Sequence, residues 1–229
     1  MSKTPKASFV IPAFNAQTFI AQAVQSCLNQ TVKAIEVVIV NDGSTDNTER
    51  IVKSLMVKDE RVKLINQENQ GRCIARNVGN KASTGEWVFV LDADDIALPT
   101  RVSDTFAYLK KNPGVDIVYG KFHGINALGD IIGLAEVEPF SIEKVKQTGL
   151  TFIGHSTMAY SRRVLDLVNY SPGEWDRHCI DDWYFQICAY KAKFRFGACN
   201  KIFSQYRINP KQRDEAMIKA MKDECLKSV

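Results

Sequence analysis

Three carboxylates stand within four positions, directly after a short apolar run. The stretch "VFVLDADDIALP", residues 88–99, carries Asp92, Asp94 and Asp95 after four apolar residues. In an extended chain, side chains two residues apart point to the same side. Carboxylates this close repel one another, and a divalent cation such as Mg²⁺ or Mn²⁺ neutralises them well because it prefers oxygen ligands. A solvated turn that caps a helix is the plain alternative.

Two further polar segments follow apolar runs earlier in the chain. Asn15 comes shortly after the run 7–11, and "NDGSTDNTE", residues 41–49, comes directly after the run 35–40. Asp, Gly, Ser and Thr are also the ordinary residues of turns, so this segment alone favours a turn and helix cap. Asp42 nevertheless stands at the end of an apolar strand, where a carboxylate could accept hydrogen bonds from a base or a ribose.

An acidic pair opens a predicted helix late in the chain. The segment 181–192 begins with Asp181 and Asp182 and continues with Trp183. Acids at a helix N-terminus are favoured by the helix dipole, which by itself explains the pair.

Alternating strands and helices must position these side chains. The predicted strands are 7–11, 35–40, 62–65, 87–91 and 115–119. Apolar residues at helical spacing lie between them, and this alternation is typical of a mainly parallel sheet covered on both faces. Ligands bind beyond the carboxyl ends of the strands in such sheets. We therefore expect Asn15, Asn41, Asp42 and the carboxylates of 92–95 to meet at one edge.

The pattern changes after about residue 120. The segments expected there are a turn at 127–130, a short helix at 141–147, a strand at 155–160, a helix at 162–168, a strand at 194–206 and a tail with helical spacing at 210–229. No clear linker separates these segments from the first half. The chain therefore reads as a single domain, residues 1–229, with a first half to about 120 and a smaller second half from about 121.

Composition excludes several classes of function. The net charge of the 229-residue chain is only +4, and basic residues alternate with acidic ones, so a nucleic-acid partner is not indicated. No apolar run reaches the length of about 18 residues that a membrane helix needs. The start does not match a secretion signal. Six cysteines without a CxxC pair indicate free thiols of a cytoplasmic protein. Peripheral contact with an anionic membrane is compatible with the mild positive charge.

Three segments together resemble the family 2 glycosyltransferases. They are "SFVIPAFNAQTFIAQAVQSCLNQT", "EVVIVNDGSTDNT" and "NQGRCIARNVGNKASTGEWVFVLDADD", which match in the same order and at similar spacing over about residues 7–110. Several long motifs in register are far more specific than a lone Asp-x-Asp. The resemblance implies an α/β protein of the GT-A fold, with a Rossmann-like, mainly parallel sheet flanked by helices. It also implies a nucleotide-sugar donor and a bound Mn²⁺ or Mg²⁺ ion.

The resemblance assigns roles to individual residues. The residues that would bind the nucleotide sugar are Pro12, Ala13, Asn15, Asp42, Arg76, Asp92 and Asp94. Within this set Asp42 would hold the base or ribose, and Arg76 would lie near the donor. Asp92 and Asp94 match the family's Asp-x-Asp pair. We expect Asp94 to be the main metal ligand and Asp92 to support the ribose or a metal-bound water.

The second half matches the family less closely. The family carries a Glu-Asp pair at the start of a late helix, so Asp182 would be the catalytic base and Asp181 is a mild departure. His155, Trp175 and Arg207 are candidates for contacts with the acceptor or the phosphates. Each also has an ordinary structural explanation, because single histidines and loop aromatics commonly serve packing.

The predicted activity is inverting transfer of one sugar from a nucleotide sugar, commonly a UDP-sugar in this family, to a glycan or lipid-linked acceptor. Bacterial surface polysaccharide or lipopolysaccharide synthesis is the usual context. Because a QxxRW motif and membrane helices are missing, single-sugar transfer is favoured over polymerisation. A non-catalytic nucleotide-sugar-binding module is the alternative. A phosphatase-type hydrolase would carry its Asp-x-Asp pair on an early strand, followed by Thr or Val. It is disfavoured because the pair here comes at the fourth predicted strand and Asp94 is followed by Asp95 and Ile96.

Overall fold

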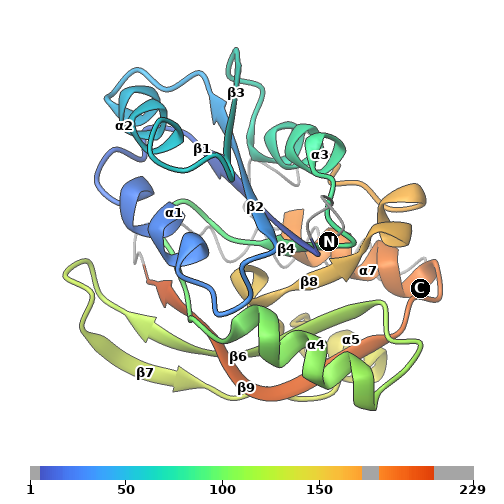
Figure 1. Ribbon diagram of the computed structural model, residues 1–229. Helices are drawn as coiled ribbons and strands as arrows, with labels where there is room; N and C mark the ends of the chain where they lie inside the picture. Colours follow the sequence, from blue (N-terminus) through green and yellow to red (C-terminus); the bar gives the residue numbers. More distant parts are fainter. Residues whose placement is uncertain (1–5, 172–180, 209–229) are drawn as a thin grey trace.

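The first half of the chain alternates strands and helices, as the sequence predicts. The computed structural model describes residues 6–171 and 181–208 (Figure 1). Its first elements are β1 (Ala7–Ala13), α1 (Ile20–Leu28), β2 (Ile35–Asp42), α2 (Thr48–Met56), β3 (Val62–Gln67), α3 (Arg72–Ala82), β4 (Trp87–Val90), β5 (Ile96–Ala97) and α4 (Arg101–Lys111). The predicted strands and helices of this half are therefore present, with the two-residue β5 in addition.

The second half departs from the predicted boundaries. Its elements are β6 (Ile117–Ile125), β7 (Ile131–Ala135), α5 (Ile142–Thr148), η1 (His155–Thr157), β8 (Ala159–Ser161), η2 (Arg162–Asp166), α7 (Asp181–Lys191) and β9 (Phe196–Arg207). The segment predicted as a strand at 155–160 begins as a 3₁₀ turn, because the Thr157 hydroxyl donates to the Gly154 carbonyl at 2.6 Å and competes with strand pairing. The segment predicted as an α-helix at 162–168 is a short 3₁₀ helix.

Parallel pairing brings the polar strand ends to one edge of the sheet. β3, β2, β1 and β4 are neighbours in this order and all run parallel. Ala13 pairs with Asn41 and Val10 with Val90, so the ends of β1, β2 and β4 lie together. Beyond β4, the strands β8, β6, β9 and β5 complete the path, and β8 pairs antiparallel with both of its neighbours. The molecule has the predicted α/β architecture.

Two apolar layers cover the two faces of this sheet. Side chains alternate along a strand, so Phe9 of β1 and Phe89 of β4 enter one core, whereas Val10 and Val90 enter the other. Helices α1, α2 and α4 contribute to the first core, and α3 and α7 to the second. Figure 1 shows α1 and α2 on one side of β1 to β4 and α3 on the other. The packing of helices on both faces of the sheet fixes the positions of the strand ends.

The acidic turn is held by two distant parts of the sheet. The turn, residues 91–95, leaves β4 and leads directly into β5, which pairs antiparallel with β9 through Ala97 and Ser204. The Leu98 main-chain N–H donates to the carbonyl of Phe203 at 2.9 Å. Because β5 and β4 are far apart on the path of strands, the sheet curls and the turn spans the opening between them.

Among the helices of the described residues, none is long and apolar enough to span a bilayer. The four cysteines within the described ranges, Cys27, Cys73, Cys188 and Cys199, are free thiols, as the sequence predicts. Cys179, Cys225 and the predicted tail helix at 210–229 lie outside the described residues.

Candidate active site

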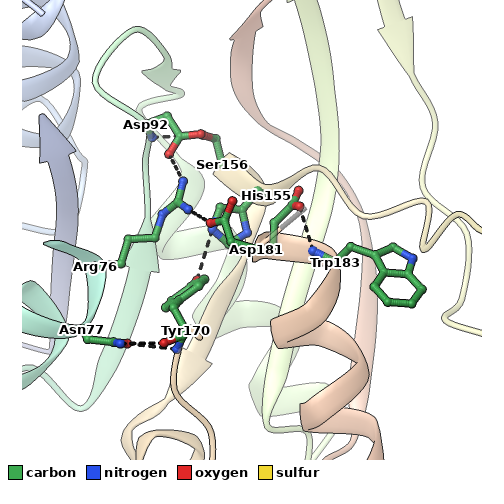
Figure 2. Close-up of polar contacts among 9 residues, drawn as sticks. Arg76, Asn77, Asp92, His155, Ser156, Tyr170, Asp181 and Trp183 are labelled. Carbon is green, nitrogen blue, oxygen red and sulfur yellow. Dashed lines mark hydrogen bonds and ion pairs between the residues drawn. The ribbon is translucent and has the colours of Figure 1, made fainter. Parts of the chain in front are cut away.

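Arg76 lies at the centre of a buried polar cluster that joins both halves of the chain (Figure 2). Its side chain comes from α3, and Nη2 donates to Asp92 Oδ1 at 2.7 Å. Its Nη1 forms an ion pair with Asp181 Oδ2 at the start of α7. The guanidinium also lies over the ring of Tyr170, 5.3 Å from its centroid. The structure thus brings together Arg76, Asp92 and Asp181, three residues that the sequence assigned to the site separately.

The carboxylates of this cluster titrate differently because their surroundings differ. Burial by itself favours the neutral form of Asp92, but the charge of Arg76 outweighs it and holds the pKa of Asp92 below its usual value. Burial raises the pKa of Asp181 to about 6, against the opposing effect of Arg76. Both groups are therefore ionised at neutral pH and share one buried cation.

Asp94 and Asp95 follow on the same turn. Burial, and next the charge of Asp92, raise the pKa of Asp94 to about 6. Asp95 is buried, and its Oδ1 accepts the main-chain N–H of Arg207 at 2.8 Å. Burial, together with the charges of Asp92 and Asp94, raises the pKa of Asp95 well above its usual value. Asp95 is therefore an internal anchor of the turn.

His155 supports the cluster from behind. Its Nε2 lies 3.1 Å from the hydroxyl oxygen of Tyr170, and the two rings meet edge to face (Figure 2). Burial, and next the charge of Arg76, lower the pKa of His155 to about 4. The imidazole is therefore neutral at pH 7 and supplies no positive charge for a phosphate group. The neighbouring Ser156 hydroxyl accepts the main-chain N–H of Asp92 at 3.0 Å.

Asp182 is the more accessible member of the acidic pair. Asp181 is buried and paired with Arg76, whereas Asp182 is only partly buried. The main-chain N–H of Trp183 donates to Asp182 Oδ1 at 2.7 Å, which holds the carboxylate at the first turn of α7. The two neighbouring aspartates therefore differ in what they can do, because Asp181 is engaged inside the protein and Asp182 can meet a ligand.

The loops after β1 and β2 are bound to each other. Asn15 has φ +49°, in the left-handed region that asparagine tolerates better than most residues. Its Oδ1 accepts the main-chain N–H of Thr45 at 2.8 Å, and its own N–H donates to Ser44 Oγ at 3.0 Å. Pro12 and Ala13 lie at the end of β1 directly before this loop. The structure thus groups these three predicted nucleotide-binding residues at the carboxyl edge.

Asp42 anchors the start of α3. Its Oδ1 accepts the side-chain amide of Gln67 at 2.7 Å and the main-chain N–H of Gln70 at 2.9 Å, and its Oδ2 accepts the N–H of Gly71 at 2.9 Å. The carboxylate is buried at the end of β2. Because three protein donors already bind it, Asp42 fixes the helix that carries Arg76. Asp42 could accept a hydrogen bond from a ribose only through the remaining lone pair of Oδ2.

Arg207 and Trp175, two candidates for acceptor or phosphate contacts, have different outcomes. The Arg207 guanidinium is occupied by main-chain carbonyls, among them that of Asp94, with an Nε to oxygen distance of 3.0 Å. Arg207 therefore contacts the main chain of the acidic turn. Trp175 lies outside the described residues.

A divalent cation fits the donor set of the turn. Asp94 is a carboxylate whose pKa is raised by burial and by the nearby charge of Asp92, so a bound cation would favour its ionised form. Within residues 6–171 and 181–208, no cluster of three His, Cys, Asp or Glu side chains forms a complete metal cage. Mg²⁺ and similar ions commonly use one or two protein carboxylates together with phosphate oxygens, so a cage is not required. Asp94, and Asp92 through the oxygen that Arg76 leaves, would hold the ion.

Sequence reasoning missed three residues that complete the site. Asn77 exchanges two hydrogen bonds with the main chain of Tyr170, at 2.7 and 2.9 Å. Ser156 positions Asp92, and the Tyr170 ring stacks beneath Arg76. Asn77 stands directly after Arg76 in the segment "ARN", which was the one available signal for it. Tyr170 and Ser156 carry no local signal because their partners are remote in sequence.

The parallel strands, the acidic turn after β4 and the helices on both faces define the class of GT-A glycosyltransferases. The model of glycosyl transferase family 2 matches residues 8–168, and the chain belongs to this family. An uncharacterised glycosyltransferase of Methanocaldococcus jannaschii is 28% identical over 227 residues, covering 95% of this chain and 76% of that protein. The hyaluronan synthase of Pasteurella multocida is 34% identical over 146 residues, 63% of this chain but only 15% of that protein.

Solved structures show the same fold. S. aureus TarS in complex with UDP-GlcNAc superposes with a TM-score of 0.72 at 22% identity, covering 89% of this chain and 59% of that one. The mannosyltransferase PcManGT of Pyrobaculum calidifontis, in complex with GDP-Man and Mn²⁺, superposes with a TM-score of 0.67 at 19% identity, covering 91% and 58%. The chain thus spans less than two thirds of either structure, and these likenesses concern the fold.

Proposed function

We propose that the chain is an inverting glycosyltransferase that moves one sugar from a nucleotide sugar to a hydroxyl group of a saccharide or lipid-linked acceptor, with Mn²⁺ or Mg²⁺. The observation that carries this proposal is the buried contact of Arg76 with both Asp92 and Asp181. It joins the acidic turn, where a diphosphate and metal would bind, to the helix start that carries Asp182. This contact supports a donor site and a base that act next to each other.

The residues divide the work of the transfer. Asp94 and Asp92 would hold the metal ion, which would supply Lewis-acid stabilisation to a departing diphosphate. Arg76 keeps Asp92 and Asp181 ionised and in place. The oxygen of the acceptor hydroxyl group attacks the anomeric carbon on the face opposite the diphosphate. Asp182 accepts the proton that this hydroxyl group loses.

The donor class that we favour is a UDP-sugar. TarS, which shares the fold, has been solved with UDP-GlcNAc and with UDP. The matches to a hyaluronan synthase and a chondroitin synthase support a saccharide acceptor and a role in bacterial surface polysaccharide synthesis. PcManGT holds GDP-Man, so GDP belongs in any test of the donor.

The first prediction concerns donor binding. In calorimetric titrations of the whole chain with UDP, GDP and dTDP, each with and without Mn²⁺, we expect UDP to bind and Mn²⁺ to strengthen its binding. Asp94→Ala removes the main proposed ligand and should abolish the effect of Mn²⁺. The matched control is Asp166→Ala, because this exposed aspartate lies on η2 and outside the site. Failure of all three nucleotides to bind the wild type would contradict the proposal.

The second prediction separates an enzyme from a non-catalytic nucleotide-sugar-binding module. Asp182→Asn should keep Mn²⁺-dependent UDP binding and lower the release of UDP from a UDP-sugar, with saccharide acceptors present, by about 100-fold or more, the usual contribution of a general base. Asp166→Asn should release UDP at the wild-type rate. Binding without measurable release by the wild type would favour the module.

A further inference from the structure

Arg207, the last residue of β9, is buried beneath the acidic turn, with 7% of its surface exposed. Its guanidinium donates to four oxygens, namely the main-chain carbonyls of Asp94 at 3.0 Å, Asn126 at 2.7 Å and Ala127 at 3.1 Å, and the side-chain carbonyl of Gln22 at 3.2 Å. One side chain therefore joins the acidic turn, the loop between β6 and β7, and helix α1.

The same residue also binds the turn through its main chain. The Arg207 N–H donates to Asp95 Oδ1 at 2.8 Å, while Nε donates to the carbonyl of Asp94. Within the turn, the Asp95 N–H donates to the carbonyl of Asp92 at 3.1 Å. Two consecutive residues of the turn are thus held by one residue of β9.

The contacts of the Arg207 guanidinium do not neutralise its positive charge. The four oxygens that it binds are uncharged carbonyl and amide oxygens. Its guanidinium also lies over the ring of Phe19, 4.1 Å from the centroid. A buried positive charge therefore stands behind Asp94 and Asp95. On the other flank, Arg76 forms an ion pair with Asp92. The acidic turn lies between two arginines, one paired with a carboxylate and one with the main chain.

We propose that Arg207 is a positioning residue for metal and diphosphate binding. Its guanidinium fixes the main chain of Asp94, so that the carboxylate is directed toward the ion before the nucleotide arrives. Because three of its nitrogens are engaged with protein oxygens, Arg207 does not itself contact a phosphate. This inference rests on the proposed function, since it takes Asp94 as the metal ligand.

The test compares Arg207→Met, Arg207→Lys and a control by calorimetric titration with UDP and with GDP, each with and without Mn²⁺. Methionine keeps an apolar stem and removes every donor. Lysine keeps the charge but cannot serve four oxygens in the geometry of the guanidinium. The control is Arg195→Met, because Arg195 is exposed and its side chain donates only a 3.4 Å bond to Pro113 within the described residues. Thermal unfolding is followed for every variant.

We expect Arg207→Met to weaken Mn²⁺-dependent nucleotide binding by about 10-fold or more, the usual effect of losing a residue that orients a metal ligand. Binding of the nucleotide without Mn²⁺ should stay at the wild-type level. The Mn²⁺-dependent affinity of Arg207→Lys should lie between those of the wild type and Arg207→Met, and that of Arg195→Met should match the wild type. If Arg207→Met does not fold, Arg207→Lys carries the same comparison.

Three outcomes would overturn the inference. Unchanged Mn²⁺-dependent binding, with a lower unfolding temperature alone, would leave Arg207 a purely structural residue. Equal losses with and without Mn²⁺ would show that Arg207 contacts the nucleotide or that the whole pocket deforms. A wild type that binds neither UDP nor GDP would overturn the proposed function itself. This outcome is distinguishable from the other two because it is seen in the wild-type titration alone.

Discussion

Arg76 determines the state of two carboxylates at once. A buried cation is costly unless ionised groups and hydrogen bonds compensate it, and Asp92 and Asp181 both do so here. The pairing also distinguishes two aspartates that are adjacent in sequence, because Asp181 is turned inward and Asp182 remains partly accessible. The sequence predicted each of these residues as part of a site. It could not predict their contact, since 105 positions separate Arg76 from Asp181.

The third prediction concerns the pH dependence at His155. Its pKa is about 4 in the folded chain, compared with an ordinary value of 6.5. The unfolded chain therefore takes up a proton on this group below pH 6.5 while the folded chain does not, so the folded state loses stability as the pH falls from 6.5 toward 4. At about 1.4 kcal/mol per pH unit, the loss is about 2 kcal/mol at pH 5.

The measurement is urea unfolding of the wild type and His155→Gln at pH 7 and pH 5. We expect the difference in unfolding free energy, wild type minus variant, to fall by about 2 kcal/mol between the two pH values, because glutamine does not titrate. Parallel changes in the two proteins would show that His155 is not the group responsible.

Helix α3 is placed by its contacts with the strands. Asp42 binds the main chain just before it, and Gly79 lets its middle approach β1 closely. A Cβ atom at Gly79 would stand 2.5 Å from Cγ1 of Val10 and 3.2 Å from Cγ2 of Val40. The depth of Arg76 in the site is therefore set by a glycine three residues further along the same helix.

The fourth prediction is that Gly79→Ala destabilises the chain. Overpacking typically costs about 1–3 kcal/mol. Replacing glycine by alanine in a helix gains about 1 kcal/mol of helix propensity, so we expect the overpacking cost to be the larger effect. The control is Gly133→Ala in β7, where an added Cβ meets nothing within 4 Å. Chemical denaturation measures both. A Gly79→Ala variant as stable as Gly133→Ala would contradict the close packing.

The elements of the first half were predictable because three of their strands, β1, β2 and β4, are buried along nearly their full length. Most residues of these strands are apolar, and the sequence displays such runs directly. The second half was less predictable. β6 runs to Ile125 although residues 121–123 within it are only partly buried, because it pairs with β9 through residues about 80 positions away. No local pattern reports such a partner, so the predicted strand ended too early.

At the scale of the molecule, two consecutive residues of α3 attach the two halves to each other. Arg76 binds Asp181, and Asn77 exchanges two hydrogen bonds with the main chain of Tyr170 (Figure 2). These contacts cross from α3 in the first half to Tyr170 and the start of α7 in the second half. Helix α3 therefore helps to set the relative position of the proposed metal ligands and the proposed base.

The fifth prediction is that Asn77→Ala lowers the unfolding free energy by about 1–3 kcal/mol, since it leaves a main-chain N–H and a carbonyl of Tyr170 without partners. Asn29→Ala is the control, because Asn29 is exposed directly after α1 and its side chain accepts a hydrogen bond only from the nearby Gln25 among the described residues. The control should stay within about 0.5 kcal/mol of the wild type. Urea unfolding at pH 7 compares them, and equal losses would refute a special role for Asn77.

The curl of the sheet has a consequence for how the chain matures during synthesis. Every oxygen of the acidic turn is already present once residue 95 has left the ribosome. Its shape, however, depends on the pairing of β5 with β9 and on the bond between Arg207 and Asp95, which are 112 positions apart. Closing a loop of this length is a slow, non-local step. The nascent chain therefore carries the carboxylates long before it can arrange them, and we expect assembly of the site to be one of the last events of folding.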